Sequence, residues 1–279
     1  MPLAANSYGK SGIRLVQVRR LGARHDVKDL TVAVRFEGRF EAAHVEGDNS
    51  DVLPTDTMKN TVYALARDFT SEEIEEFGLV LSAHFLHENP QVARAEIAIE
   101  EREWDRIGET AFRGSSCERR TARVSRTRES LVVESGLKDL LILKSAQSGF
   151  AGFKRDRYTT LKETTDRILA TSLTAVWTHA SPAGHRASSR EVRRTLLETF
   201  AAHASASVQH TLYAMGEAAL AGHGDLSQIH LTMPNRHHLL VDLGPFGLKN
   251  ENEIFVATEE PYGLIEATVT RNQPGSPKD

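Results

Sequence analysis

Cysteine is almost absent from this chain, which carries only Cys117 among its 279 residues. A single cysteine excludes an intramolecular disulfide and a zinc site built on cysteine ligands. No apolar run approaches the roughly 18 residues that a membrane-spanning helix needs. The first residues lack the apolar stretch of a signal peptide, and the last three are not Ser-Lys-Leu. We therefore expect a cytoplasmic protein that does not bind a membrane.

An excess of positive charge is also missing. Lys and Arg total 34 against 38 Asp and Glu, a formal net charge of -4, whereas nucleic-acid-binding domains are usually basic. One dense basic stretch, Arg119–Arg128, has the charge to grip phosphate. The stretch contains no aromatic residue, and Glu118 and Glu129 offset part of its positive charge. These features favour a solvated strand and loop over a nucleic-acid-binding site. Binding of RNA or another polyanion is the less favoured hypothesis.

The common signatures of cofactor and catalytic sites are absent. The sequence has no Walker loop, no dinucleotide-binding G-x-G-x-x-G, no G-x-S-x-G and no H-E-x-x-H. His84 and His87 are spaced for one helix face but have no third ligand nearby. The sequence therefore predicts neither a metal site nor an organic cofactor.

Hydrophobic periodicity predicts a mixed α and β protein. Alternating residues predict strands at 13–20, 30–38, 92–103, 121–135, 137–145, 169–180, 227–233 and 237–243, the last two separated by a break at Pro234-Asn235. Amphipathic segments predict helices at 58–69, capped by Thr55-Asp56-Thr57, and at 71–89, 188–203 and 205–224. The tail 271–279 has a turn-forming, disordered composition.

These elements form two tandem β-β-α-α-β-β units, 1–134 and 135–279. Short connections favour antiparallel sheets, with each pair of helices covering one sheet face, so the predicted class is α+β. An open sheet of this kind leaves edges that a second subunit can cover.

Four segments together resemble the urate oxidase (uricase) family over nearly the whole chain. They are Tyr8-Gly9-Lys10, PTDTMKNTVYALA (54–66), LKSAQSGFAGFKRDRYTTLKETTDRIL (143–169), and SASVQHTLY (205–213) with LTMPNRHHLLVDL (231–243). The resemblance implies the tunnelling fold, in which tandem units assemble into β-barrels, and a homotetramer with active sites between subunits. It also implies the oxidation of urate by dioxygen and water to 5-hydroxyisourate and hydrogen peroxide, without metal, flavin or haem.

The resemblance also assigns the substrate-binding residues. Phe150 matches the ring that stacks on urate, Arg167 and Gln209 match the residues that bind opposite edges, and Val208 contributes a backbone N–H. These types suit a flat anion, because an arginine fork binds it in a bidentate manner and an amide both donates and accepts. The remaining matches are Thr55 and Asp56 at the substrate, Asn235 facing the oxygen or water site, and Leu161 and Ile265 in the apolar wall.

Lys10, Thr55 and His237 match the residues that relay protons in this family. A lysine acts as a base near neutral pH only where burial or a neighbouring charge lowers its pKa. Another hypothesis keeps the fold and changes the ligand to a different purine or a pterin. Relatives of that kind often hold zinc through histidines, and this sequence offers no three-ligand set.

Overall fold

The computed structural model describes residues 3–114, 117–181 and 189–271, and confirms an α+β protein with antiparallel strand pairs. The chain divides into two compact units. The first comprises Met1–Gly136 with Thr178–Ser188, and the second comprises Leu137–Trp177 with Ser189–Asp279. Strands β7 (Leu131–Lys144) and β8 (Leu169–His179) therefore contribute residues to both units.

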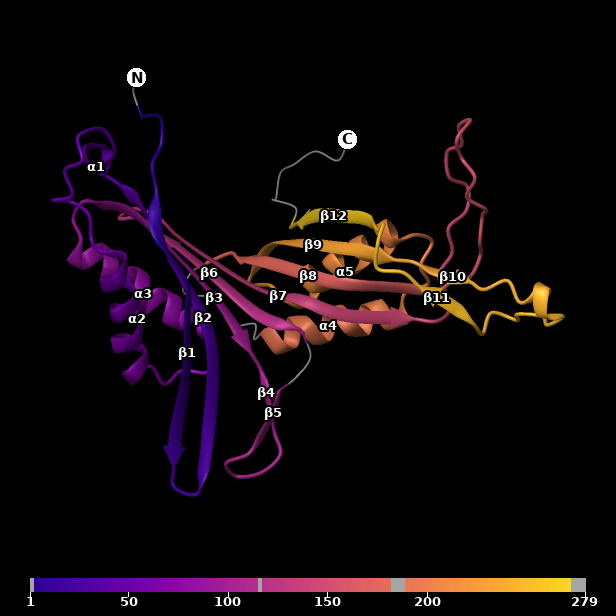
Figure 1. Ribbon diagram of the computed structural model, residues 1–279, viewed down its shortest axis with the longest axis horizontal. Coiled ribbons are helices and arrows are strands. Elements are labelled where there is room, and N and C mark those ends of the chain that lie inside the picture. The colour runs from indigo at the N-terminus through magenta and orange to yellow at the C-terminus, as the bar shows by residue number, and fades with distance from the viewer. Residues whose placement is uncertain (1–2, 115–116, 182–188, 272–279) are drawn as a thin grey trace. The chain divides into compact units, whose positions relative to one another are not determined.

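The first unit has strands in the order β1-β2-β3-β6-β7 and helices along one face of the sheet (Figure 1). Its elements are β1 (Tyr8–Leu21), β2 (Arg24–Gly38), α1 (Glu41–Val45), α2 (Thr55–Asp68), α3 (Ile74–Glu88), β3 (Val92–Arg102), the hairpin β4 (Trp104–Arg106) and β5 (Phe112–Gly114), and β6 (Arg119–Arg126). The alternating residues of β2 and β3 explain this packing, because one face of each strand is buried, including Val32, Val34, Ile97 and Ile99.

The second unit follows the same plan, with strand order β7-β8-β9-β12 (Figure 1). Its other elements are α4 (Ser189–Ala202), α5 (Val208–Gly222), β9 (Leu226–Arg236), β10 (His238–Leu240), the 3-10 turn η1 (Gly244–Phe246), β11 (Phe255–Ala257) and β12 (Gly263–Thr270). Strand β12 pairs with β9, whereas β10 and β11 form a separate hairpin. Within the described residues, neither unit closes its strands into a barrel.

A glycine lets one helix of each unit approach its sheet closely. A Cβ at Gly78 of α3 would lie 2.6 Å from Val124 Cγ2, and one at Gly216 of α5 would lie 2.6 Å from Val269 Cγ2. Both distances are below van der Waals contact, so each helix depends on the missing side chain. The two units thus share the same order of elements, and in each of them a helix glycine permits close contact with the sheet.

Several sequence predictions were wrong in detail. Segment 121–135 is not one strand, because a turn at Thr127–Ser130 separates β6 from β7. Pro234 does not break β9, because the strand continues to Arg236 and Pro234 is paired in register with Leu264 of β12. Thr55 is the first helical residue of α2 rather than a cap, and no side chain caps that helix. Strand β12 was not predicted, and the tail from 272 onward lies outside the described residues.

The basic stretch is engaged within the chain rather than free for a polyanion. Arg120 is bonded to the carboxylates of Glu73 and Glu75, and Glu75 also accepts a 2.6 Å bond from Ser135 Oγ. His179 Nε2 lies 2.9 Å from that hydroxyl. The other arginines bind carbonyl oxygens, Ser82 or Glu134. These contacts assign the stretch a structural role in the first unit.

Candidate active site

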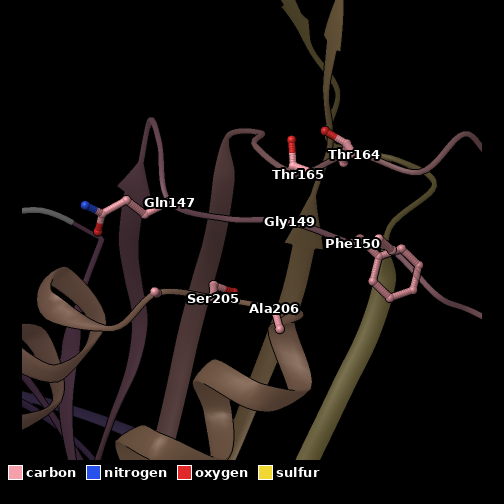
Figure 2. Close-up of a pocket in the computed structure, with 9 residues that line it drawn as sticks. Gln147, Gly149, Phe150, Thr164, Thr165, Ser205 and Ala206 are labelled. Carbon is pink, nitrogen blue, oxygen red and sulfur yellow. The ribbon is translucent and has the colours of Figure 1, made fainter.

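Phe150 lies on the loop after β7, and backbone bonds hold it in place. Its N–H donates to Thr164 O at 2.7 Å, and the Thr164 N–H donates to Phe150 O at 3.0 Å. The Phe153 ring stacks on it with centroids 4.9 Å apart and planes 13° apart. Figure 2 shows the ring at the end of the segment that begins at Gln147. The ring orientation is therefore set by neighbouring backbone and by a second aromatic residue.

Ser205 connects this loop to the segment that precedes α5. Its N–H donates to Gln147 O at 2.9 Å, and its carbonyl accepts from the Gly149 N–H at 2.8 Å. Lys144 supports the same segment by donating to His203 O at 2.6 Å, at the end of α4. The resemblance assigned no role to Ser205 or Lys144, and only their places inside the matched segments could have indicated one.

An open pocket of about 460 Å³ lies between these two segments (Figure 2). This volume is within the range of small-molecule sites. The pocket is lined by Gln147, Gly149, Phe150, Ala151, Thr164, Thr165, Ala204, Ser205 and Ala206, all of the second unit. It offers an aromatic face, hydroxyl groups and exposed backbone to a ligand.

Arg167 adds a positive charge beside the aromatic ring. Its guanidinium carbon lies 5.3 Å from the Phe150 centroid. The buried Nε atom has no hydrogen-bond partner in the described part of the chain. Burial lowers the pKa of this guanidinium, which still stays protonated near neutral pH. A buried donor without an acceptor costs free energy, and a guanidinium beside an aromatic ring is a suitable partner for a planar anion.

The start of α5 provides further donors. Ser207 caps the helix by accepting the His210 N–H at 3.1 Å, which leaves the N–H groups of Val208 and Gln209 without an intrahelical acceptor. The Val208 side chain is buried, whereas Gln209 is exposed. Free N–H groups and the helix dipole make this end attractive to anions.

The other predicted residues of the second unit occupy the end of β9 and nearby strands. Asn235 is buried and pairs with Gly263, and Ile265 follows two residues later on β12. His237 lies just after β9, where its carbonyl accepts the Thr258 N–H at 2.9 Å. Leu161 is exposed on the loop between Phe150 and Arg167, so it is not a core residue.

Lys10, Thr55 and Asp56 belong to the first unit, where β1 packs beside the start of α2. Tyr8 fixes this junction, because its hydroxyl accepts the Leu53 N–H at 2.9 Å and its ring packs against Phe40. A hydrogen bond from Lys59 is the main cause that lowers the pKa of Asp56, and the charge of Lys10 contributes. Thr55 is half-buried at the first position of the helix.

The two units thus each offer a helix start with polar groups beside it. The second presents an aromatic face, an unsatisfied guanidinium and free amides, and the first presents Lys10, Thr55 and Asp56. Within the described residues, no three His, Cys, Asp or Glu side chains cluster as a metal would require. Nor does that part of the chain contain a helix long and apolar enough to cross a membrane. The elements define a tandem-repeat α+β protein whose second unit contains an open pocket.

Comparison with known proteins identifies the family. The uricase family model matches residues 6–128 and 133–266. The curated uricase of Arthrobacter globiformis is 46% identical over 272 residues, covering 96% of this chain and 90% of that protein. The uricase of Dictyostelium discoideum is 37% identical over 280 residues, covering 97% and 98%. The chain belongs to the uricase family.

Solved structures agree with this assignment. A crystal structure of Arthrobacter globiformis uricase superposes with a TM-score of 0.94 at 44% identity, covering 100% of this chain and 97% of that one. The urate oxidase of Bacillus sp. TB-90 superposes with a TM-score of 0.85 at 24% identity, covering 95% and 100%, and shows the fold alone. The fold is the tunnelling fold of uricases, as the family resemblance implied.

Proposed function

We propose that this chain oxidises urate with dioxygen and water, without a metal or organic cofactor, at sites completed by a second subunit. Urate oxidation follows from membership of the uricase family. The observation that carries the site assignment is Arg167, which lies beside the Phe150 ring and whose buried Nε has no acceptor among the described residues. The family match does not favour a different purine or a pterin as the substrate. The contacts that Arg119–Arg128 make within the chain do not favour binding of a polyanion.

Urate binding uses the donors and the ring of the second unit. The planar anion stacks on Phe150, accepts from the Arg167 fork on one edge, and meets Gln209 and the Val208 N–H on the other. Leu161 and Ile265 form apolar wall, and Asn235 faces the oxygen or water position. Because Arg167 is half-buried beside an apolar ring, its bonds to the anion are stronger than they would be in water.

Proton transfer uses Lys10, Thr55 and His237. Lys10 accepts a proton from bound urate through the Thr55 hydroxyl, and His237 orients or discharges the lysine. Thr55 and Asp56 also contact the substrate, so this helix start has both binding and relay roles. The carboxylate of Asp56, which lies near Lys10, is paired with Lys59.

The substrate supplies the electrons in this reaction. Loss of a proton makes urate electron-rich, and the dianion passes one electron to dioxygen. Recombination of the two radicals forms a peroxide adduct, and departure of hydrogen peroxide leaves an electrophilic carbon that water attacks. The balance is urate, dioxygen and water to 5-hydroxyisourate and hydrogen peroxide. The protein contributes orientation, proton management and exclusion of bulk water.

The assembly in this proposal is a cytoplasmic homotetramer. The relay residues Lys10 and Thr55 belong to one unit, and the stacking and edge-binding residues belong to the other. Open sheets in both units leave edges that other copies can cover, so barrels form only on assembly. Active sites then lie between chains.

The test measures loss of the ultraviolet absorbance of urate together with peroxide release by protein stripped of metal with a chelator. We expect full turnover with no addition. A chelated protein that is inactive, and that regains activity when a metal is restored, would falsify the cofactor-free mechanism. Peroxide without urate loss would instead contradict the assigned substrate.

A further inference from the structure

The pocket is built from three backbone segments that pair with one another. Ser148 forms a parallel bridge with Ser205, and Phe150 forms an antiparallel bridge with Thr164. All three segments contribute residues to the pocket lining. In Figure 2, Ser205 lies below the segment that carries Phe150. The segment that carries the aromatic ring is therefore held by backbone pairing to both of the others.

The side chain of Ser205 makes a further hydrogen bond toward helix α5. Only 5% of this residue is exposed, and its hydroxyl donates to the Ser207 carbonyl oxygen at 3.0 Å. The same carbonyl accepts the Thr211 N–H at 3.1 Å, which is the first hydrogen bond of the helix. The Ser205 hydroxyl therefore ties the start of α5 to the segment that pairs with the pocket loop.

A second bond across this turn is weaker. The Ala206 N–H donates to His210 Nδ1 at 3.5 Å, which is longer than the usual range of about 2.7–3.2 Å for such a bond. The bond of the Ser205 hydroxyl is the shorter of the two and lies on a buried residue. Loss of this hydroxyl should therefore loosen the turn into α5 while the backbone bonds of Ser205 to Gln147 and Gly149 remain.

The donors proposed for one edge of urate follow directly after this turn. Val208 and Gln209 are the first two residues of α5, and they offer a backbone N–H and a side-chain amide. Their positions relative to the Phe150 ring depend on how the chain turns from residue 205 into the helix. Hydrogen bonds are sensitive to distance and angle, so a small change in this turn weakens the bonds to a planar ligand.

We propose that Ser205 is a positioning residue of the urate site. Its hydroxyl sets the start of α5 so that Val208 and Gln209 meet the edge of a planar anion stacked on Phe150. This inference rests on the proposed function, because it requires urate to bind in this pocket. Ser205 acts through the helix start and is not a catalytic residue.

The test compares binding of an unreactive urate analogue to the full-length parent, Ser205→Ala and Ser205→Thr. Loss of the hydroxyl should weaken binding about two- to tenfold, the range expected for one hydrogen bond, and should raise KM for urate more than it lowers kcat. Ser205→Thr keeps the hydroxyl and should bind the analogue more tightly than Ser205→Ala does.

Ser82→Ala is the matched control. Ser82 is also buried, and its hydroxyl donates to the Leu79 carbonyl oxygen at 3.1 Å, but it lies in the first unit. Its loss removes a buried hydroxyl without changing the start of α5, so affinity for the analogue should stay at the parental value.

A double-mutant cycle separates positioning from a general loss of stability. If Ser205 acts through the start of α5, Ser205→Ala combined with Gln209→Ala should weaken binding by less than the product of the two single fold-changes. Combined with Arg167→Ala, which removes the opposite edge, the fold-changes should multiply.

Two results would overturn the positioning role and leave urate oxidation intact. One is that the losses multiply in both combinations, and the other is that Ser205→Ala binds the analogue as tightly as Ser82→Ala. A parent that neither binds the analogue nor consumes urate would overturn the proposed function together with this inference.

Discussion

At the scale of single residues, Arg167 is the most informative position. Its Nε is buried and has no acceptor among the described residues, and we propose that its guanidinium binds the ligand. Arg167→Ala should weaken binding of an unreactive urate analogue by about 1–3 kcal/mol, because a paired donor is lost. Gln209→Ala should weaken it by a similar amount from the opposite edge. Calorimetric titration of both variants measures these losses.

The control for this pair is Arg194→Ala. Arg194 is an exposed residue of α4 that pairs with Glu198, so its loss should leave affinity for the analogue near the parental value. If Arg167→Ala and Gln209→Ala bind the analogue as tightly as this control, the proposed orientation of urate is wrong.

Lys10 should affect chemistry rather than binding. Lys10→Met removes the proposed proton acceptor and should slow the chemical step by a large factor, while affinity for the analogue stays near parental. The pH–rate profile should lose the limb that belongs to the coupled Lys10, Thr55 and His237 set. Stopped-flow measurements across pH provide the test.

Lys249→Met is the control, since Lys249 is an exposed lysine of the second unit and most such substitutions change stability by less than about 0.5 kcal/mol. An unchanged rate and profile in folded Lys10→Met protein would remove this lysine from the mechanism.

At the scale of elements, the pairing of β1 with β2 fixes where Lys10 lies. A Cβ on Gly9 would lie 2.0 Å from the Val34 carbonyl oxygen, which is backbone and cannot rotate away. Gly9→Ala should therefore displace β1 and lower the melting temperature by several degrees, since overpacking costs about 1–3 kcal/mol. It should also lower turnover, because Lys10 is the next residue.

Gly222→Ala offers a matched comparison. A Cβ there meets no atom within 4 Å, so the melting temperature should change little. Calorimetric scans of the two variants measure the difference. Equal melting temperatures would mean that β1 and β2 can separate at Gly9 without cost.

Elements with strong periodicity could be predicted from sequence, and contacts between distant elements could not. Strands β2, β3 and β8 were predicted because alternating apolar residues face a core. Strand β12 was missed because most of its side chains, such as Leu264, are exposed, so the pattern is weak. Arg167 was found through resemblance alone, since nothing in its local pattern reveals that its Nε is buried. Ser205 was missed because the hydrogen bonds that join it to the Gln147–Gly149 segment are made by its backbone.

At the scale of the whole molecule, the proposed division of each site between chains predicts complementation. Thr55→Ala and Gln209→Ala should each be nearly inactive as pure assemblies. After subunit exchange, roughly a quarter of the sites in an equal mixture should combine a native Thr55 with a native Gln209 from another chain. Urate turnover should recover in that proportion.

Unmixed samples taken through the same exchange procedure are the control and should stay inactive. Mass spectrometry verifies that mixed assemblies form. A verified mixture without recovery would show that Thr55 and Gln209 act from the same chain.

The contact between Ser135 and His179 has a consequence for the order in which the chain matures on the ribosome. Both side chains belong to the first unit, yet 44 residues of sequence separate them, and most of that sequence builds the second unit. Glu75 and Ser135 emerge early, and their polar cluster stays incomplete until β8 has been made. Domains often fold in the order of synthesis. Here we expect the first unit to complete its folding only after the end of β8 has been synthesised. A nascent chain stalled before residue 179 should therefore remain bound by chaperones.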